Sequence, residues 1–345
     1  MGGTWVTHHM GYLFREMTRY GLDRDLIETG APRTGKHRSY YSLNVPGSTP
    51  RNCPPEEAGA IQAKAWDAFV NVDGQFGRTL CPLPHAQLDN AIVPRPTVEK
   101  WDRVSCAERF EQIKHQLTAE EQGMLVSLLL HISGGSMENS SLWDMVRSHA
   151  LLMHSTDNFG DVWLRYKLRA GQTELARRMF REAVDSGLDY SFSTPVAGVK
   201  QGDSGVFVRT AGGETLRAKK LICTVPLNVL KNVEFQPPLS PERQEAINIG
   251  HVNHMNKIHA DVRNPELESW NGMRFPGKLM YVYSDGVLPN GDVHITGFGA
   301  DQRGIFVPED DPQAAVEEFN KVHPMDIRSL VRRPTTLLFL PFKIR

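Results

Sequence analysis

The sequence lacks the cysteine pattern of a metal or redox site. Its four cysteines, Cys53, Cys81, Cys106 and Cys223, are widely separated, and no two of them have C-x-x-C spacing. Zinc-binding and dithiol motifs are therefore not predicted. Few and isolated cysteines are typical of a reducing compartment, so we expect an intracellular protein.

Long apolar runs and an excess of one charge are also missing. The apolar run from Met124 to Ile132 is far shorter than the roughly 20 residues that a membrane-spanning helix needs. The chain does not open with a basic segment followed by an apolar one, so no secretory signal is predicted. The formal net charge is −1, which gives no reason to expect binding to nucleic acid or to an anionic membrane.

The sequence contains no G-x-G-x-x-G motif. In dinucleotide-binding proteins this motif joins a strand to a helix and holds the pyrophosphate at the helix N-terminus. It belongs to a strand–helix–strand unit of roughly 30 residues or more. No segment of this sequence is therefore predicted to form such a unit.

What is present is the composition of a globular protein with a mixed α/β fold. The 345 residues, 40% hydrophobic and 23% charged, suffice for one large or two ordinary domains. In the run from Gly171 to Leu230, helical spacing predicts a helix that ends near Gly187. Alternating residues between 196 and 218 then predict a strand meander, and the apolar run 221–226 predicts a short buried strand closed by Pro226.

Similar patterns predict further elements on both sides of this run. The expected helices cover residues 8–20, 56–70, 105–116, 119–132, 141–154, 241–246 and 313–322. Strands are expected at 278–283 and 293–299, joined by a turn near 289–292. Residues 256–262 alternate as a strand, which places Lys257, His259 and Asp261 on one face.

Two stretches are candidates for chemistry, and each has an ordinary alternative. Gly2 and Gly3 precede Thr4 and Trp5, a pattern that lets the backbone pass close to a flat or charged group. The alternative is a simple turn. Lys257 lies in a strand, where the alternative is a solvent-facing lysine.

Several local sequences resemble the flavin-containing amine oxidases, most closely the fungal monoamine oxidases with non-covalent FAD. The resemblance runs almost continuously from Gly2 to Val331. The motifs that carry it are Gly2–Val6, Gly77–Thr79, Gly134–Ser141, Ala170–Gln172, Thr194–Val196 and Ala218–Leu227.

The resemblance implies a division of the chain. Residues 1–29 and 170–227 would form part of an FAD-binding domain. Residues 30–169 and 228–330 would form a substrate-binding domain of mixed sheet and helices. The tail 331–345 has no counterpart in the family, and we expect it to derive from a frame shift or an unspliced intron.

The resemblance also implies roles for individual residues. Lys257 matches the lysine that holds a water beside flavin N5. The expected FAD-binding residues are Gly2, Gly3, Thr4, Trp5 and, on the adenine side, Val196. The segment 159–168 resembles a strand that lines the amine pocket, although a core strand has a similar sequence. The expected pocket walls are Trp163, Leu164, Met280 and Tyr283.

The activity implied is oxidation of an amine to an imine and then an aldehyde, with reduction of FAD and then of O2 to H2O2. The family's two substrate-sandwiching aromatics have no counterpart here, so we expect an incomplete chain in which FAD binding is weakened or lost. Two alternatives stay open: an inactive fragment or pseudoenzyme, and another oxidase of the superfamily for polyamines, amino acids or secondary metabolites. An amino-acid oxidase would need an arginine for the carboxylate, and Arg165 and Arg274 are the candidates.

The expected partners are a small-molecule amine and O2, without nucleic acid or membrane insertion. The expected location is the cytoplasm or peroxisome. A homodimer is one oligomeric state consistent with the resemblance.

Overall fold

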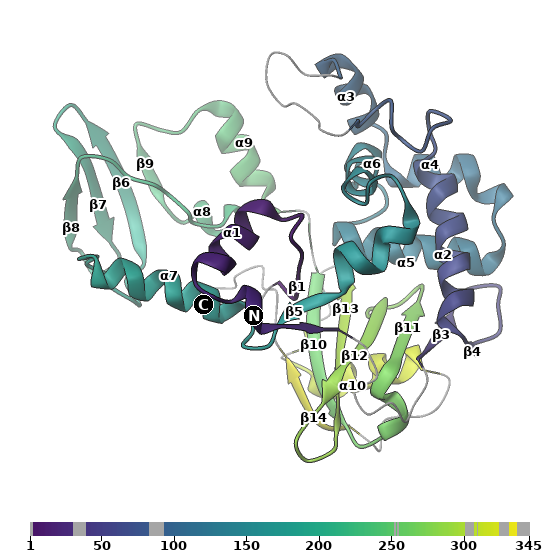
Figure 1. Ribbon diagram of the computed structural model, residues 1–345. Helices are drawn as coiled ribbons and strands as arrows, with labels where there is room; N and C mark the ends of the chain where they lie inside the picture. The colour runs from purple at the N-terminus through teal and green to yellow at the C-terminus, as the bar shows by residue number, and fades with distance from the viewer. Residues whose placement is uncertain are drawn as a thin grey trace. The chain divides into compact units, whose positions relative to one another are not determined.

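The computed structural model describes residues 3–29, 39–82, 93–251, 253, 255–300, 307–308, 310–323 and 331–336. The chain forms two compact units, one of residues 1–176 and 253–339 and the other of residues 177–252 and 340–345. Figure 1 shows the elements of each. Gly2 and most of the tail, residues 337–345, lie outside the described residues. The division into an FAD-binding and a substrate-binding domain stays a prediction.

The first unit is built on a seven-stranded sheet. Its strand order is β14-β10-β13-β12-β11-β3-β4, and only the β11–β3 pair is parallel. The strands are β3 (Tyr40–Asn44), β4 (Arg51–Cys53), β10 (Met255–Val262), β11 (Trp270–Arg274), β12 (Tyr281–Val287), β13 (Val293–Ala300) and β14 (Val331–Thr336). The alternation predicted for 256–262 is confirmed, because Ile258, Ala260 and Val262 belong to one core cluster and Lys257 does not.

Helices cover both faces of this sheet. On one face α10 (Pro312–Val322) buries Phe319 against Ile258, Val282 and Ile295. On the other face α5 (Ala119–Ser133) contacts β11, β12 and β13 and packs against α2 (Pro55–Val70). The same helical layer contains α3 (Arg95–Asp102), α4 (Cys106–Ile113), the 3-10 turn η2 (Lys114–Gln116) and α6 (Leu142–Leu151). A 3-10 turn, η5 (Pro265–Ser269), leads into β11.

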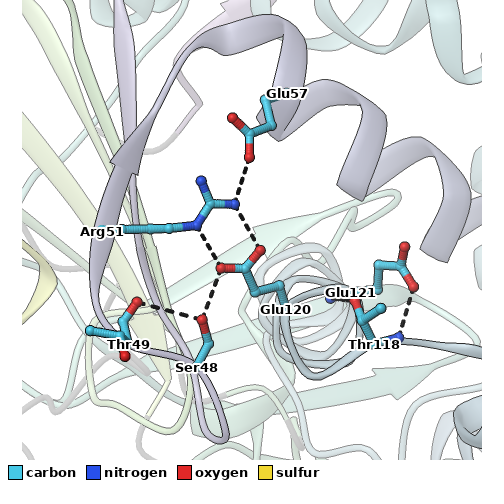
Figure 2. A network of polar contacts seen from close by, with 7 residues as sticks. All are labelled: Ser48, Thr49, Arg51, Glu57, Thr118, Glu120 and Glu121. Atoms are coloured by element: carbon cyan, nitrogen blue, oxygen red, sulfur yellow. Dashed lines mark hydrogen bonds and ion pairs between the residues drawn. The ribbon is translucent and has the colours of Figure 1, made fainter.

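The start of α5 is fixed by a polar network (Figure 2). Thr118 and Glu121 form a capping box, in which each side chain accepts the other residue's backbone N–H. Beside it Arg51 of β4 donates to Glu120 at 2.8 Å and forms an ion pair with Glu57 of α2 at 2.7 Å. These contacts connect β4, α2 and α5 at the point where α5 begins.

A smaller sheet of order β1-β5-β2 completes the first unit. It consists of β1 (Trp5–Val6), β2 (Leu26–Glu28) and β5 (Tyr166–Leu168), and α1 (Gly11–Arg19) buries Met17 against it. Two short helical turns precede β5, the 3-10 turn η3 (Thr156–Asn158) and the π-helical turn η4 (Gly160–Leu164), and another 3-10 turn, η1 (Asp23–Asp25), precedes β2.

The predicted strand over 159–168 is therefore wrong in its first half. Phe159 and Trp163 form a ring contact with centroids 5.0 Å apart, and Asp161 and Arg165 form an ion pair at 2.6 Å. Both pairs have the four-residue spacing of a helical turn, and these contacts prevail over the strand propensity of the aromatic residues.

The second unit contains a four-stranded sheet of order β8-β7-β6-β9. Its strands are β6 (Val196–Gly202), β7 (Gly205–Thr210), β8 (Thr215–Ala218) and β9 (Glu234–Gln236), accompanied by α8 (Leu227–Leu230) and α9 (Pro241–Ile249). The helix α7 (Gln172–Asp185) enters this unit, and the predicted helix and meander are both confirmed.

The predicted buried strand over 221–226 is wrong. These residues form no strand, and Ile222 is 87% exposed. A short apolar run does not by itself distinguish a strand from other structure, and among the described residues no strand pairs with 221–226.

The other predicted helices are present with shifted ends, whereas α3 was not predicted. None of the helices in the described part of the chain is long and apolar enough to cross a membrane. All four cysteines are unpaired, and the described residues contain no cluster of three or more His, Cys, Asp or Glu side chains suited to a metal.

Candidate active site

The first unit contains a cavity of about 560 Å³, a volume suited to a small organic molecule. Its walls come from the segment around β1, from β3, β11 and β12, from the helices α2, α5 and α6, and from η3 and η4. Most of the lining is apolar or aromatic, and the principal side chains are Trp5, Tyr41, Leu128, Ile132, Leu151, Phe159, Trp163, Leu164, Met273 and Tyr281. No Asp, Glu, Lys or Arg is among the described residues that line it. Such a cavity favours an uncharged ligand.

Lys257 lies behind this wall, on the sheet face that carries Phe298. Its side chain is buried, with the residue 6% exposed, which excludes the solvent-facing alternative. The ammonium donates a hydrogen bond to the hydroxyl of Thr4, which lines the cavity, and lies 5.1 Å from the centre of the Phe298 ring. Lys257 is thus a buried amine linked to the cavity wall.

The surroundings of Lys257 shift its protonation toward the neutral form. Its pKa is lowered to about 8, because burial and the Lys167 ammonium lower it and the Asp285 carboxylate only partly opposes them. Lys167 and Asp285 form an ion pair of their own between β5 and β12, with side chains 14% and 13% exposed. Near neutral pH an amine with this pKa exchanges a proton readily.

Trp5 lies where the cavity meets the sheet. Its ring centroid is 5.3 Å from that of Tyr283 and 5.7 Å from that of Phe298. Its indole Nε1 is buried without a hydrogen-bond partner. The neighbouring Gly3 has ordinary space, since an added Cβ would come no closer than 3.9 Å to Gln172 Cγ. The expected approach of this backbone to a flat or charged group stays a prediction.

The structure brings together some of the residues singled out from the sequence and separates others. Gly3, Thr4, Trp5, Trp163 and Leu164 line the one cavity, and Lys257 reaches it through Thr4.

The two other expected pocket walls, Met280 and Tyr283, are not among the lining residues. Met280 packs against Val126 and Leu130. Tyr283 lies behind Trp5, and burial raises its pKa well above the ordinary value. Val196 begins β6 in the second unit and is half-buried. Gly2 lies outside the described residues.

Sequence reasoning missed His131, which lines the cavity from the last turn of α5. Its ring centroid lies 5.0 Å from that of Tyr281 and 4.9 Å from that of Phe298. Burial, aided by the Lys257 charge, lowers its pKa to about 4. The available signal was one imidazole within the apolar run 124–132.

Comparison with known families gives a match along most of the chain. The model of the flavin-containing amine oxidoreductases matches residues 1–338. The chain belongs to this family. The family implies a flavin cofactor and chemistry on small-molecule amines, as the sequence resemblance predicted. The narrower resemblance to the fungal enzymes stays a prediction.

Two curated bacterial relatives illustrate the similarity. A pseudooxynicotine dehydrogenase of a Pseudomonas species is 26% identical over 332 residues, which cover 94% of this chain and 61% of that protein. A nicotine dehydrogenase of Pseudomonas putida is 26% identical over 269 residues, which cover 76% of this chain and 50% of that protein. The chain therefore spans between half and two thirds of the length of these relatives.

Solved structures show the same fold at low identity. A putrescine oxidase structure superposes with a TM-score of 0.72 at 17% identity, covering 97% of this chain and 72% of the other. The cyclohexylamine oxidase of Brevibacterium oxydans superposes with a TM-score of 0.65 at 14% identity, covering 98% and 73%. The predicted mixed α/β fold of the amine oxidase type is confirmed.

The residues present fit the ring end of a flavin. A flat, largely apolar ring needs aromatic walls and few polar neighbours, as found around Trp5 and Thr4. The buried amine of Lys257, linked to the cavity through Thr4, is a polar group near this end. The glycine-rich pyrophosphate motif is not part of this sequence.

Proposed function

We propose that this protein serves flavin-dependent oxidation of small, predominantly apolar amines to imines, with non-covalent FAD and with O2 reduced to H2O2. The observation that carries the proposal is Lys257, a buried amine of lowered pKa that is bonded to the wall of an apolar cavity. The names of the relatives, which include putrescine and cyclohexylamine oxidases and nicotine dehydrogenase, support an amine substrate.

In this proposal the cavity binds the amine as its free base. The lining described above carries no carboxylate to hold an ammonium ion, and the Lys257 charge disfavours a second cation nearby. Trp163, Leu164 and Phe159 bury the apolar part of the substrate and exclude water. Bound FAD would supply the two-electron oxidation at the carbon next to the nitrogen, with O2 as the final oxidant and H2O2 as its product.

The role proposed for Lys257 is to hold a water molecule and exchange protons beside the reacting atoms. Thr4 orients its ammonium, and the Lys167–Asp285 pair sets the local charge. The resulting pKa, about 8, suits an amine that gives up and regains a proton during turnover.

The amino-acid oxidase alternative receives no support from the cavity. Arg274 forms an ion pair with Glu318 at 3.1 Å, and Arg165 forms ion pairs with Glu28 at 3.1 Å and Asp161 at 2.6 Å. Neither arginine lines the cavity, so a substrate carboxylate would lack the guanidinium partner it needs there.

The test is to purify the chain in the presence of FAD, record the flavin absorbance that stays bound, and measure H2O2 released from a panel of aromatic and aliphatic amines. We expect bound flavin and amine-dependent peroxide. The Lys257→Met variant should keep its flavin and lose at least about tenfold in turnover, the lower range for a residue that moves protons.

The matched control is Lys200→Met, which removes an exposed lysine of β6 and should leave turnover unchanged. A protein without flavin and without peroxide would contradict the proposal and favour the inactive-fragment alternative. Full activity of Lys257→Met would remove Lys257 from the mechanism while leaving the reaction in place.

A further inference from the structure

His131 is a cavity-lining group to which the proposed chemistry gives no task. It stands in the last turn of α5, and its ring meets the rings of Tyr281 and Phe298 nearly edge-on, at interplanar angles of 66° and 84°. These contacts fix the orientation of the imidazole. Its two nitrogens therefore face different surroundings.

Only one of these two nitrogens, Nδ1, is fully buried. Nδ1 is among the buried side-chain atoms that have no hydrogen-bond partner, and Nε2 is not among them. No hydrogen bond occupies Nε2 among the described residues, so Nε2 is the ring nitrogen that stays accessible. Because His131 lines the cavity, this nitrogen is available to a ligand there.

The burial of Nδ1 decides the tautomer. A buried N–H without an acceptor is rare and unfavourable, whereas a buried lone pair without a donor is better tolerated. The neutral ring therefore carries its proton on Nε2. Charging the ring is opposed both by burial and by the Lys257 ammonium, which lower its pKa to about 4. At neutral pH His131 presents an uncharged N–H donor.

Three polar groups near His131 in the wall are less available than its Nε2. The Tyr281 hydroxyl already donates to Asn271 Oδ1 at 3.1 Å, and the Trp5 indole nitrogen is buried. Thr4 is engaged by Lys257. The His131 N–H is thus a donor without a protein acceptor in a mostly apolar cavity, where an unmade hydrogen bond is unfavourable.

We propose that His131 determines specificity, by donating from Nε2 to an uncharged hydrogen-bond acceptor on the apolar part of the amine substrate, such as an aromatic ring nitrogen or a carbonyl oxygen. This inference rests on the proposed function. The Phe298 ring contacts both His131, at 4.9 Å between centroids, and the Lys257 ammonium, at 5.1 Å. His131 and Lys257 are therefore close enough for one small molecule to reach both.

The experiment compares benzylamine with the 2-, 3- and 4-(aminomethyl)pyridines, which have nearly the same shape and add one acceptor at three positions. Binding to the FAD-loaded chain is titrated by tryptophan fluorescence at pH 8, and kcat and KM are measured separately from H2O2. We expect at least one pyridine isomer to bind about tenfold more tightly than benzylamine, the effect of about one hydrogen bond.

Two variants test the assignment. His131→Phe keeps a ring but removes the donor, and should raise the pyridine-to-benzylamine ratio of both Kd and KM from about one tenth to about one. His131→Gln keeps an N–H donor at the Nε2 position and should restore most of the preference. Near-ultraviolet circular dichroism establishes that each variant is folded, and His131→Leu, which also lacks the donor, serves if His131→Phe does not fold.

The outcomes separate the two proposals. Equal binding of benzylamine and all three isomers by the wild type, or an unchanged preference in His131→Phe, would overturn the role of His131. If benzylamine is oxidised in either case, the proposed function stands. If the amines bind with the expected preference and none is oxidised, the role of His131 as a ligand donor stands and the proposed function fails.

Discussion

The charge on Lys257 is set by two neighbours of opposite sign. Lys167 and Asp285 lie together at the junction of β5 and β12, and each acts on the buried ammonium. Burial is the largest influence and lowers the pKa of Lys257 to about 8. The residues of this small group thus control the fraction of neutral amine at physiological pH.

This arrangement predicts opposite responses to two substitutions. Asp285→Asn removes the charge that raises the pKa of Lys257, and should lower that pKa below about 8. Lys167→Met removes a repelling charge and should raise it. The measurement is the pH dependence of the Lys257 ¹³Cε chemical shift in isotopically labelled protein, assigned with Lys257→Met. Shifts in the same direction for both variants would contradict the assignment of these two neighbours.

At the scale of elements, the close packing of α5 beside the end of β3 depends on Gly123, which has no side chain. A Cβ on Gly123 would lie 2.3 Å from Val45 Cβ, just beyond the end of β3, so the helix approaches the chain there closely. Gly59 of α2 has no atom within 4 Å of the corresponding position. Two helical glycines thus have opposite surroundings.

We expect Gly123→Ala to destabilise the first unit by about 1–3 kcal/mol through overpacking. Gly59→Ala is the matched control and should stabilise it by about 0.5–1 kcal/mol, because alanine favours a helix over the unfolded chain. Urea unfolding followed by tryptophan fluorescence gives both values. The double variant Gly123→Ala, Val45→Ala should recover part of the loss, and an additive result would show that the Val45 contact is not its cause.

The capping box of α5 gives another prediction. Thr118→Ala removes the side chain that accepts from the Glu121 N–H, and should lower the unfolding free energy by about 1 kcal/mol. Thr118→Ser keeps the hydroxyl and is the control. Without the cap the first turn of α5 should open more often, so the alanine variant should also exchange its amide hydrogens faster in that turn. The same helix carries His131 and Leu128 to the cavity. Equal stability of the two variants would exclude the cap as the cause.

The elements that sequence could predict are those whose signals are local. The helix over 119–132 followed from helical spacing within that run, and the meander from alternation within β6 and β7. The strand predicted over 221–226 is absent because a short apolar run does not by itself define a strand, and the structure leaves Ile222 exposed. The π-helical turn at 160–164 was missed because its spacing competes with a strand pattern.

The candidate site was predictable only in part for the same reason. Resemblance singled out Lys257 and Thr4, but their contact joins residues separated by 253 positions, which no local pattern reveals. Tyr283 was expected as a pocket wall, but its ring lies against the tilted ring of Trp5, which lines the cavity instead. The role of His131 could not be predicted, because it depends on the contact of its ring with Phe298 of the sheet beneath α5.

At the scale of the whole molecule, the two compact units differ in their content of tryptophan. All six tryptophans, Trp5, Trp66, Trp101, Trp143, Trp163 and Trp270, belong to the first unit. Tryptophan fluorescence therefore follows that unit alone. The histidines with lowered pKa values also belong to it: His131, His149, His154, His259 and His323. The stability of the first unit should consequently depend on pH in a way that fluorescence can isolate.

The sign of this dependence follows from proton binding. Burial lowers the pKa of His149 and His323 to about 4 and that of His259 to about 3, from an ordinary value of 6.5. Between these values the unfolded chain binds protons that the folded chain does not, so acid favours unfolding. The loss begins as pH falls below about 6.5 and continues toward pH 4. Carboxylates with lowered pKa values act only near or below their ordinary pKa of about 4, outside most of this window.

We therefore expect the first unit to lose several kcal/mol between pH 7 and pH 5, with His149 alone accounting for up to about 2 kcal/mol. His149 is fully buried and accepts from the Trp66 indole N–H at 3.1 Å. His149→Asn keeps an acceptor at that position but cannot be protonated, and should reduce the loss between the two pH values even if it lowers stability at both. Urea unfolding at pH 7 and pH 5, followed by tryptophan fluorescence, gives the difference, and His115→Asn is the control, because this exposed histidine of η2 also belongs to the first unit. An equal pH dependence in the wild type and His149→Asn would show that His149 is not one of the groups through which acid destabilises the fold.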